Sequence, residues 1–150
     1  MEYTPEDEAR ALLAKPLICE DSPAWSQQKN QPGTFTLECG LVDADGRGSG
    51  LHVQLVYRFS QKTKTRKFAF SVFQRSLGTP QRVYGLDLKQ APRKLINDHD
   101  MPHEHFGNKR EEGGDDWISW GFDDAITQFC LSTNITFVPT IEDPEEFRLT

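Results

Sequence analysis

Cysteine is scarce in this chain of 150 residues, which holds only Cys19, Cys39 and Cys130. The three are odd in number and far apart, and no Cys-x-x-Cys pair occurs. Such a pattern indicates neither a disulfide framework nor a cysteine zinc site. We therefore expect three buried thiols.

Long apolar runs are also missing. No stretch approaches the roughly 18 to 20 apolar residues that a membrane helix needs. The acidic residues 1–6 lack the basic and apolar regions of a signal peptide. These absences favour a cytoplasmic protein.

Familiar catalytic signatures are absent as well. The sequence contains no serine-centred elbow, no phosphate-cradling glycine loop and no dinucleotide fingerprint. Gly46, Gly48 and Gly50 alternate but do not open a helix. The sequence thus gives no complete enzyme signature, and it favours a protein that is not an enzyme.

Charge is distributed unevenly along the chain, whose net charge is −6. Residues 1–50 carry four bases and nine acids, residues 51–100 ten bases and three acids, and residues 101–150 three bases and eleven acids. A basic middle between acidic ends indicates either a partner-binding face or segments that neutralise one another after folding.

Hydrophobic periodicity predicts the main elements. Thr4 and Pro5 predict the start of a helix over about residues 5–14, which Pro16 ends. Apolar and polar residues alternate over 34–41, 51–59, 68–72 and 82–88, as in strands with one buried face. Apolar spacings of three and four over residues 122–132 predict an amphipathic helix. Asn134 is a plausible left-handed stop after it.

The predicted fold class is α+β, with residues 1–150 as a single domain. We expect an N-terminal helix, an antiparallel β-meander of four to six strands and a C-terminal helix packed on one face of the sheet. Residues 117–120 are expected to form a short final strand and 135–138 an edge strand. Residues 141–150 form an acidic tail that is ordered only if Phe147 docks.

Three of the four histidines lie in one segment. His103 and His105 are separated by one residue, so in an extended chain their imidazoles point to the same side. With His99 they could bind zinc or manganese and activate a water molecule. Without metal, the same histidines could transfer protons at neutral pH, and Arg93, Lys94 or Arg110 could stabilise an anionic transition state, as in a metal-independent RNase. A third interpretation is a structural or partner-contacting segment that needs no cofactor.

The order of these features resembles a family of small uncharacterised bacterial and mobile-element proteins. The resemblance covers residues 83–136: a strand with Leu86-Asp87-Leu88, Pro92, the segment Pro102-His103-Glu104-His105, a Trp-containing strand and a helix leading to Asn134-Ile135. It implies a similar topology and a setting near toxin, antitoxin or phage-defence genes, but no catalytic residue. Arg93 stands after Pro92 where a histidine would be expected, which argues against a metal site shared with the family.

The leading functional hypothesis is a small acidic protein-binding module, an inhibitor or antitoxin-like protein of a mobile element. Its partner would be another protein, one with a basic nucleic-acid-binding surface, contacted through two acidic clusters: Glu111, Glu112, Asp115 and Asp116, and Glu142, Asp143, Glu145 and Glu146. One alternative is a His-dependent, metal-dependent or metal-free nuclease or other hydrolase. A second is nucleic-acid binding through a basic hairpin tip with Lys62, Lys64, Arg66 and Lys67.

Overall fold

A ten-stranded sheet forms most of the protein in a computed structural model, which describes residues 2–20, 24–76, 78–90 and 101–148. Its main path runs β10-β2-β4-β5-β6-β7-β8-β9, while β1 pairs with β7 and β3 with β4. The strands are β1 (Glu2–Tyr3), β2 (Leu17–Glu20), β3 (Ser26–Gln27), β4 (Thr34–Val42), β5 (Gly48–Ser60), β6 (Thr65–Ser76), β7 (Thr79–Gln90), β8 (His103–Phe106), β9 (Lys109–Glu112) and β10 (Ile135–Val138).

The helices are short. They are α1 (Glu6–Leu13), the 3₁₀ helix η2 (Asp115–Ser119), α2 (Phe122–Thr133) and α3 (Pro144–Arg148). Within the described residues, no helix has the length and apolar character needed to cross a membrane.

The predicted fold class is wrong. The structure is dominated by a large mixed sheet of ten strands, in place of an antiparallel meander of four to six strands between two helices. The alternation of apolar and polar residues identified only the long strands, because a short strand has too few residues to show a period of two. Two parallel pairings, β1 with β7 and β2 with β10, join segments far apart in sequence, and local periodicity carries no signal for them.

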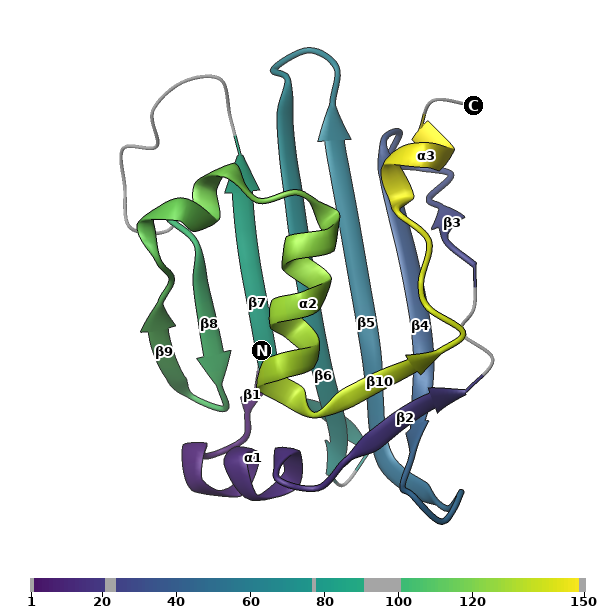
Figure 1. The fold of residues 1–150 in the computed structure, drawn as a ribbon, viewed down its shortest axis with the longest axis vertical. Helices are drawn as coiled ribbons and strands as arrows, with labels where there is room; N and C mark the ends of the chain where they lie inside the picture. Colours follow the sequence, from purple (N-terminus) through teal and green to yellow (C-terminus); the bar gives the residue numbers. More distant parts are fainter. Residues whose placement is uncertain (1, 21–23, 77, 91–100, 149–150) are drawn as a thin grey trace.

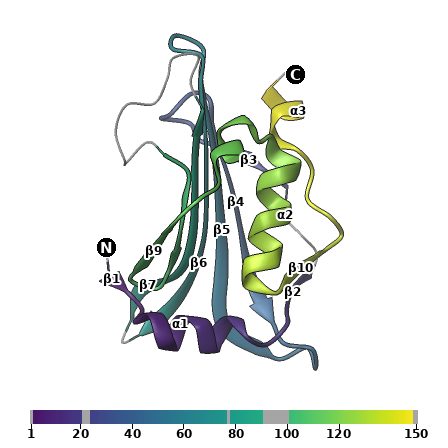
Figure 2. The ribbon, with the colours of Figure 1, turned by 60° about the vertical axis from the view of Figure 1, so that its left-hand side comes forward.

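Four long antiparallel strands, β4 to β7, form the centre of the sheet (Figure 1). Their register aligns apolar residues, as in the pairs Leu37 with Leu55, Leu55 with Phe70, and Phe70 with Leu86. Since successive side chains of a strand point to opposite faces, one face of the sheet is continuously apolar. Figure 2 shows α2, β2 and β10 against this face, while the middle of the opposite face carries no described helix.

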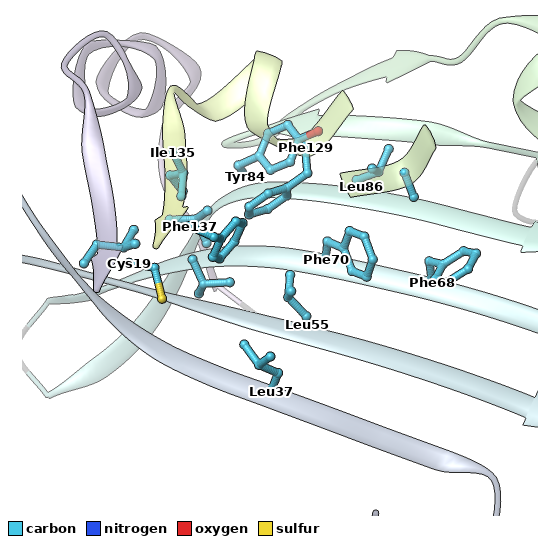
Figure 3. Packing of buried hydrophobic residues seen from close by; sticks show 14 of the residues in the cluster. Cys19, Leu37, Leu55, Phe68, Phe70, Tyr84, Leu86, Phe129, Ile135 and Phe137 are labelled. Atoms are coloured by element: carbon cyan, nitrogen blue, oxygen red, sulfur yellow. The ribbon is translucent and has the colours of Figure 1, made fainter. Parts of the chain in front are cut away.

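Helix α2 anchors the core through Phe129, which is fully buried. Its ring lies 6.0 Å from that of Phe70, 5.6 Å from that of Tyr84 and 6.1 Å from that of Phe137, measured between centroids. Figure 3 shows these rings between the helix and the long strands. One aromatic side chain therefore joins the helix, the central sheet and β10.

Helix α2 matches the predicted amphipathic helix within one residue. Asp124 accepts a hydrogen bond from the Gly121 amide (3.1 Å), and Asn134 ends the helix in the left-handed conformation with φ 58°. The Asn134 amide also donates to the Leu13 carbonyl (2.6 Å), where β2 is about to begin. The left-handed stop and the edge strand at 135–138 are confirmed.

Two local predictions are wrong. Residues 117–120 belong to η2 and its end because Trp117 and Trp120, three residues apart, stack with centroids 4.5 Å apart across a 3₁₀ turn. Thr4 does not cap α1: it is buried, and its hydroxyl accepts a hydrogen bond from Gln74 (2.9 Å). Asn108 instead accepts from the first helical amide, that of Glu6 (3.0 Å).

The expectation of three free thiols is also wrong, because a disulfide joins Cys19 to Cys39. Strands β2 and β4 are neighbours, and their pairing brings the two Cα atoms to 6.3 Å despite the distance in sequence. Cys130 on α2 remains a free thiol, and burial raises its pKa to about 11.

Candidate functional site

The face of the sheet opposite α2 carries a cluster of titratable side chains on β7 and β8. Asp87 stands directly across from His103, and Gly85 across from His105. Positions 87, 103 and 105 point away from the apolar face, onto which the intervening Leu86, Leu88 and Glu104 point. The register therefore places one carboxylate and two imidazoles together.

His103 is the most constrained member of this cluster, being buried at 6% exposure. Its Nδ1 lies 2.8 Å from the Met101 carbonyl oxygen and its Nε2 lies 3.3 Å from Oδ2 of Asp87. The His105 ring stands edge-on to it, with centroids 4.9 Å apart. One ligand atom from each of Asp87, His103 and His105 lies within 4.8 Å of the others. We call these three residues the Asp–His–His cluster.

Arg82 lies beside the cluster because the register of β6 and β7 shifts where Arg82 pairs with Phe73. Its guanidinium occupies the space over Gly85, where a Cβ would lie 1.5 Å from Nη2. Arg82 donates a hydrogen bond to Oδ2 of Asp87 (3.0 Å). Glycine at position 85 is thus required for this contact.

The surroundings shift the pKa values of the cluster. Burial alone would raise the pKa of Asp87, but the hydrogen bond from His103 and the charge of Arg82 outweigh burial and hold this pKa at about 2. Burial, together with repulsion from Arg82 and His103, lowers the pKa of His105 to about 4. At neutral pH, Asp87 is therefore ionised and His105 is neutral.

A pocket of about 790 Å³ opens beside the cluster. Its walls include four basic side chains, Arg58, Lys67, Lys89 and Arg110, and the hydroxyls of Ser60, Thr63 and Thr65. The first three bases stand directly opposite one another on β5, β6 and β7, in the pairs Arg58 with Lys67 and Lys67 with Lys89. Like charges in direct register are unfavourable in a sheet. This row of bases suits an anionic ligand, even though the whole chain is acidic.

Tyr3 completes the rim of the pocket. The parallel pairing of β1 with β7 places it there, and its ring stacks on His105 with centroids 6.1 Å apart. Its side chain is 43% exposed, so one aromatic surface faces solvent next to the cluster.

A second buried group fixes β8 from the other face. The Glu104 carboxylate accepts hydrogen bonds from the Tyr84 hydroxyl (2.5 Å), from Ser132 and from the Gln128 amide (3.4 Å). Burial and the neighbouring Glu104 raise the pKa of Tyr84 well above its ordinary value, so its hydroxyl stays a donor. These bonds tie β8 to α2 and thereby hold His103 and His105 in place.

The sequence identified part of the site. His103 and His105 come together as predicted, whereas His99 and Arg93 lie outside the described residues. Asp87, Arg82 and the pocket bases Arg58 and Lys89 were missed. The sequence did contain a clue to Asp87. It lies between Leu86 and Leu88 in a predicted strand, and because neighbouring side chains of a strand point to opposite faces, Asp87 must point away from the apolar face. His52 shares the face of the cluster but stacks on Phe73, with centroids 5.4 Å apart.

The acidic residues predicted to bind a partner lie at two separate places. Strand β9 and η2 carry the first group, and α3 with the residues before it carries the second, on opposite sides of the view in Figure 1. Several have partners within the protein: Arg10 donates to Glu111 (2.6 Å), Arg110 to Glu112 (2.7 Å) and Arg66 to Glu145. Asp143 accepts from the Glu145 amide (2.9 Å). Asp115, Asp116, Glu142 and Glu146 are exposed.

The basic hairpin residues do not form one surface. Lys62 and Lys64 are exposed at the tip, and Lys67 lines the pocket. Arg66 points to the other face, where it contacts Glu145, Gln90 and the Trp120 carbonyl. Only Lys67 of the four borders the cluster.

Comparison of the chain with known protein families, curated proteins and solved structures gives no match. The site is therefore interpreted from its own geometry and chemistry.

Proposed function

We propose that this protein hydrolyses phosphodiesters, as a nuclease or a related hydrolase, at the Asp–His–His cluster. The observation that supports this proposal is the juxtaposition of two imidazoles and a carboxylate with a basic pocket in an acidic protein. Phosphodiester cleavage needs both elements: groups that activate water, and positive charge that stabilises the developing negative charge of the phosphate.

The basic row supplies the binding part of this function. Arg58, Lys67 and Lys89 lie on adjacent strands in direct register, so a phosphate above them contacts more than one base. The substrate is therefore held by its charge, next to His103 and His105.

Hydrolysis of a fluorogenic single-stranded oligonucleotide and of bis(p-nitrophenyl) phosphate tests the proposal. The assay is run with added Zn²⁺, with added Mn²⁺ and with a chelator. We expect His103→Ala to lower the turnover rate at least about 100-fold, the usual effect of removing a positioned acid–base or water-activating group. His52→Ala is the matched control, because His52 lies on the same face but outside the pocket, and it should retain full activity.

Lysine substitutions separate binding from chemistry in the same assay. Lys67→Glu should raise KM about tenfold or more through lost phosphate attraction, while Lys62→Glu, at the tip outside this pocket, changes it little. If no condition gives hydrolysis above that of His103→Ala, the proposed activity is wrong.

Protein binding is the second candidate, and one observation favours it. Ile118 on η2 is 47% exposed and follows the exposed Asp115 and Asp116 by three and two residues. An apolar side chain near acids on the same short helix suits contact with a basic protein surface, where charge steers association and apolar burial stabilises the complex.

Affinity capture from cell lysate at physiological salt tests this candidate. We expect a partner that the wild-type protein recovers and that Asp115→Lys/Asp116→Lys loses, whereas Asp123→Lys, on the first turn of α2, retains it. Equal recovery by all three proteins, or by none, would contradict it.

A further inference from the structure

We propose that the Asp–His–His cluster is a divalent transition-metal site, with Asp87, His103 and His105 as ligands and zinc as the favoured ion. The inference deepens the proposed hydrolysis by naming its cofactor. Metal binding can nevertheless be measured without any substrate, so the two proposals can fail separately.

The hydrogen bonds of His103 supply the first argument. The Met101 carbonyl oxygen, 2.8 Å from Nδ1, can only accept a hydrogen bond, so Nδ1 carries a proton. Without a metal, Nε2 donates the hydrogen bond to Oδ2 of Asp87, 3.3 Å away, that is described above. If Nε2 gives up that proton, its lone pair faces the carboxylate oxygen, and a metal ion between the two atoms would bind both.

The same arrangement is typical of metal-binding histidines. They usually donate their second ring proton to a backbone carbonyl or a carboxylate, which fixes the tautomer and aims the free nitrogen at the metal. Met101 plays this part for His103. Arg82 does the equivalent for Asp87, since its guanidinium bonds to the carboxylate and orients it.

One distance agrees directly with tetrahedral coordination. Zinc bonds of about 2.0–2.1 Å at tetrahedral angles separate neighbouring ligand atoms by about 3.3 Å. Nε2 of His103 and Oδ2 of Asp87 are 3.3 Å apart, and the His105 ligand atom lies within 4.8 Å of both. The third ligand is therefore near enough to be recruited by an ion that the other two hold.

The ligand set and the pocket indicate which metal binds and what it does. Two imidazole nitrogens and one carboxylate oxygen suit zinc, with manganese and cobalt as weaker substitutes. The three protein ligands leave a fourth position for water. Asp87, His103 and His105 all line the pocket, so that water would meet a phosphate held by the basic row. A metal-bound water would lose a proton to solvent near neutral pH, and the resulting hydroxide would attack the phosphorus atom. The bond from phosphorus to one ester oxygen would break in the same step, and the departing alkoxide would take up a proton from solvent.

The competing explanation is an ion-pair network that includes Arg82. If His103 is doubly protonated, then Arg82, Asp87 and His103 form a purely structural ion-pair network that needs no metal. The metal site predicts that the purified protein binds zinc and is stabilised by it, whereas the ion-pair network predicts neither effect.

Chelator-treated full-length protein is titrated with ZnCl₂ by calorimetry, and its melting temperature is recorded with and without zinc. We expect one equivalent to bind and the melting temperature to rise by about 5–10 °C at zinc concentrations near 100 times the dissociation constant. Co²⁺ should give the visible absorption of a tetrahedral N/O site.

Three variants complete the test. His105→Ala removes the less buried of the two histidine ligands, and it should lose the melting shift and the Co²⁺ spectrum. Asp87→Asn should weaken binding at least tenfold. His52→Ala should behave as the wild type. Absence of binding by the wild-type protein, or undiminished binding by His105→Ala, overturns the metal site. If the metal site is overturned in this way, oligonucleotide hydrolysis that persists in chelator would still support the proposed hydrolase function.

Discussion

Replacing Phe129 with alanine should lower the free energy of unfolding by about 3–5 kcal/mol, the usual cost of deleting a large aromatic side chain from a packed core. Phe129 is fully buried and contacts the rings of Phe70, Tyr84 and Phe137. Because these rings belong to β6, β7 and β10, the cavity would loosen three elements at once. Chemical denaturation followed by tryptophan fluorescence measures the change.

Leu131 provides the matched control on the same helix. It is 72% exposed, so Leu131→Ala should change the free energy of unfolding by less than about 0.5 kcal/mol. Similar losses in the two variants would mean that α2 does not pack against the sheet through Phe129.

Removing the disulfide with Cys19→Ala/Cys39→Ala should lower the free energy of unfolding by about 3 kcal/mol. The bond closes a loop of 20 residues in sequence separation, and the loop entropy of the unfolded chain gives this magnitude. Among the described residues, the register of β2 with β4 consists of the single pair Ile18 with Val42. The disulfide therefore adds a covalent link where the strand pairing is short.

Thiol titration checks the bond directly. The denatured protein should show one reactive thiol before reduction, that of Cys130, and three after it. In the native state Cys130 should react slowly at neutral pH, because its pKa of about 11 leaves almost no thiolate. Three thiols without reductant would contradict the disulfide.

The features that were predicted correctly are those that depend on the geometry of a single segment of the chain. Alternation identified the four long strands, and apolar spacing identified α2, because each pattern is set by the geometry of one segment. Asn134 was identifiable as a helix stop because asparagine tolerates positive φ. His103 and His105 could be paired because residues two apart in a strand share a face.

The missing features depend on contacts between distant segments. No period marks β2 as the parallel neighbour of β10, and the Cys19–Cys39 bond follows from which strands are adjacent. Asp87 joins the histidines through the register of β7 with β8, and Arg82 through a register shift opposite Phe73. Each is a property of strand order and register, which single-segment reasoning does not supply.

The parallel pairing of β2 with β10 has a consequence for how the protein is made on the ribosome. Leu17 pairs with Ile135, so β2 must wait for a segment made much later before its hydrogen bonds to β10 can form. Until α2 and β10 have been synthesised, the apolar face of the long strands also lacks its cover (Figure 2). The nascent sheet thus exposes an apolar surface between the synthesis of β7 and that of β10, and exposed surfaces of this kind are what chaperones recognise. Completion of this fold therefore waits for the synthesis of β10.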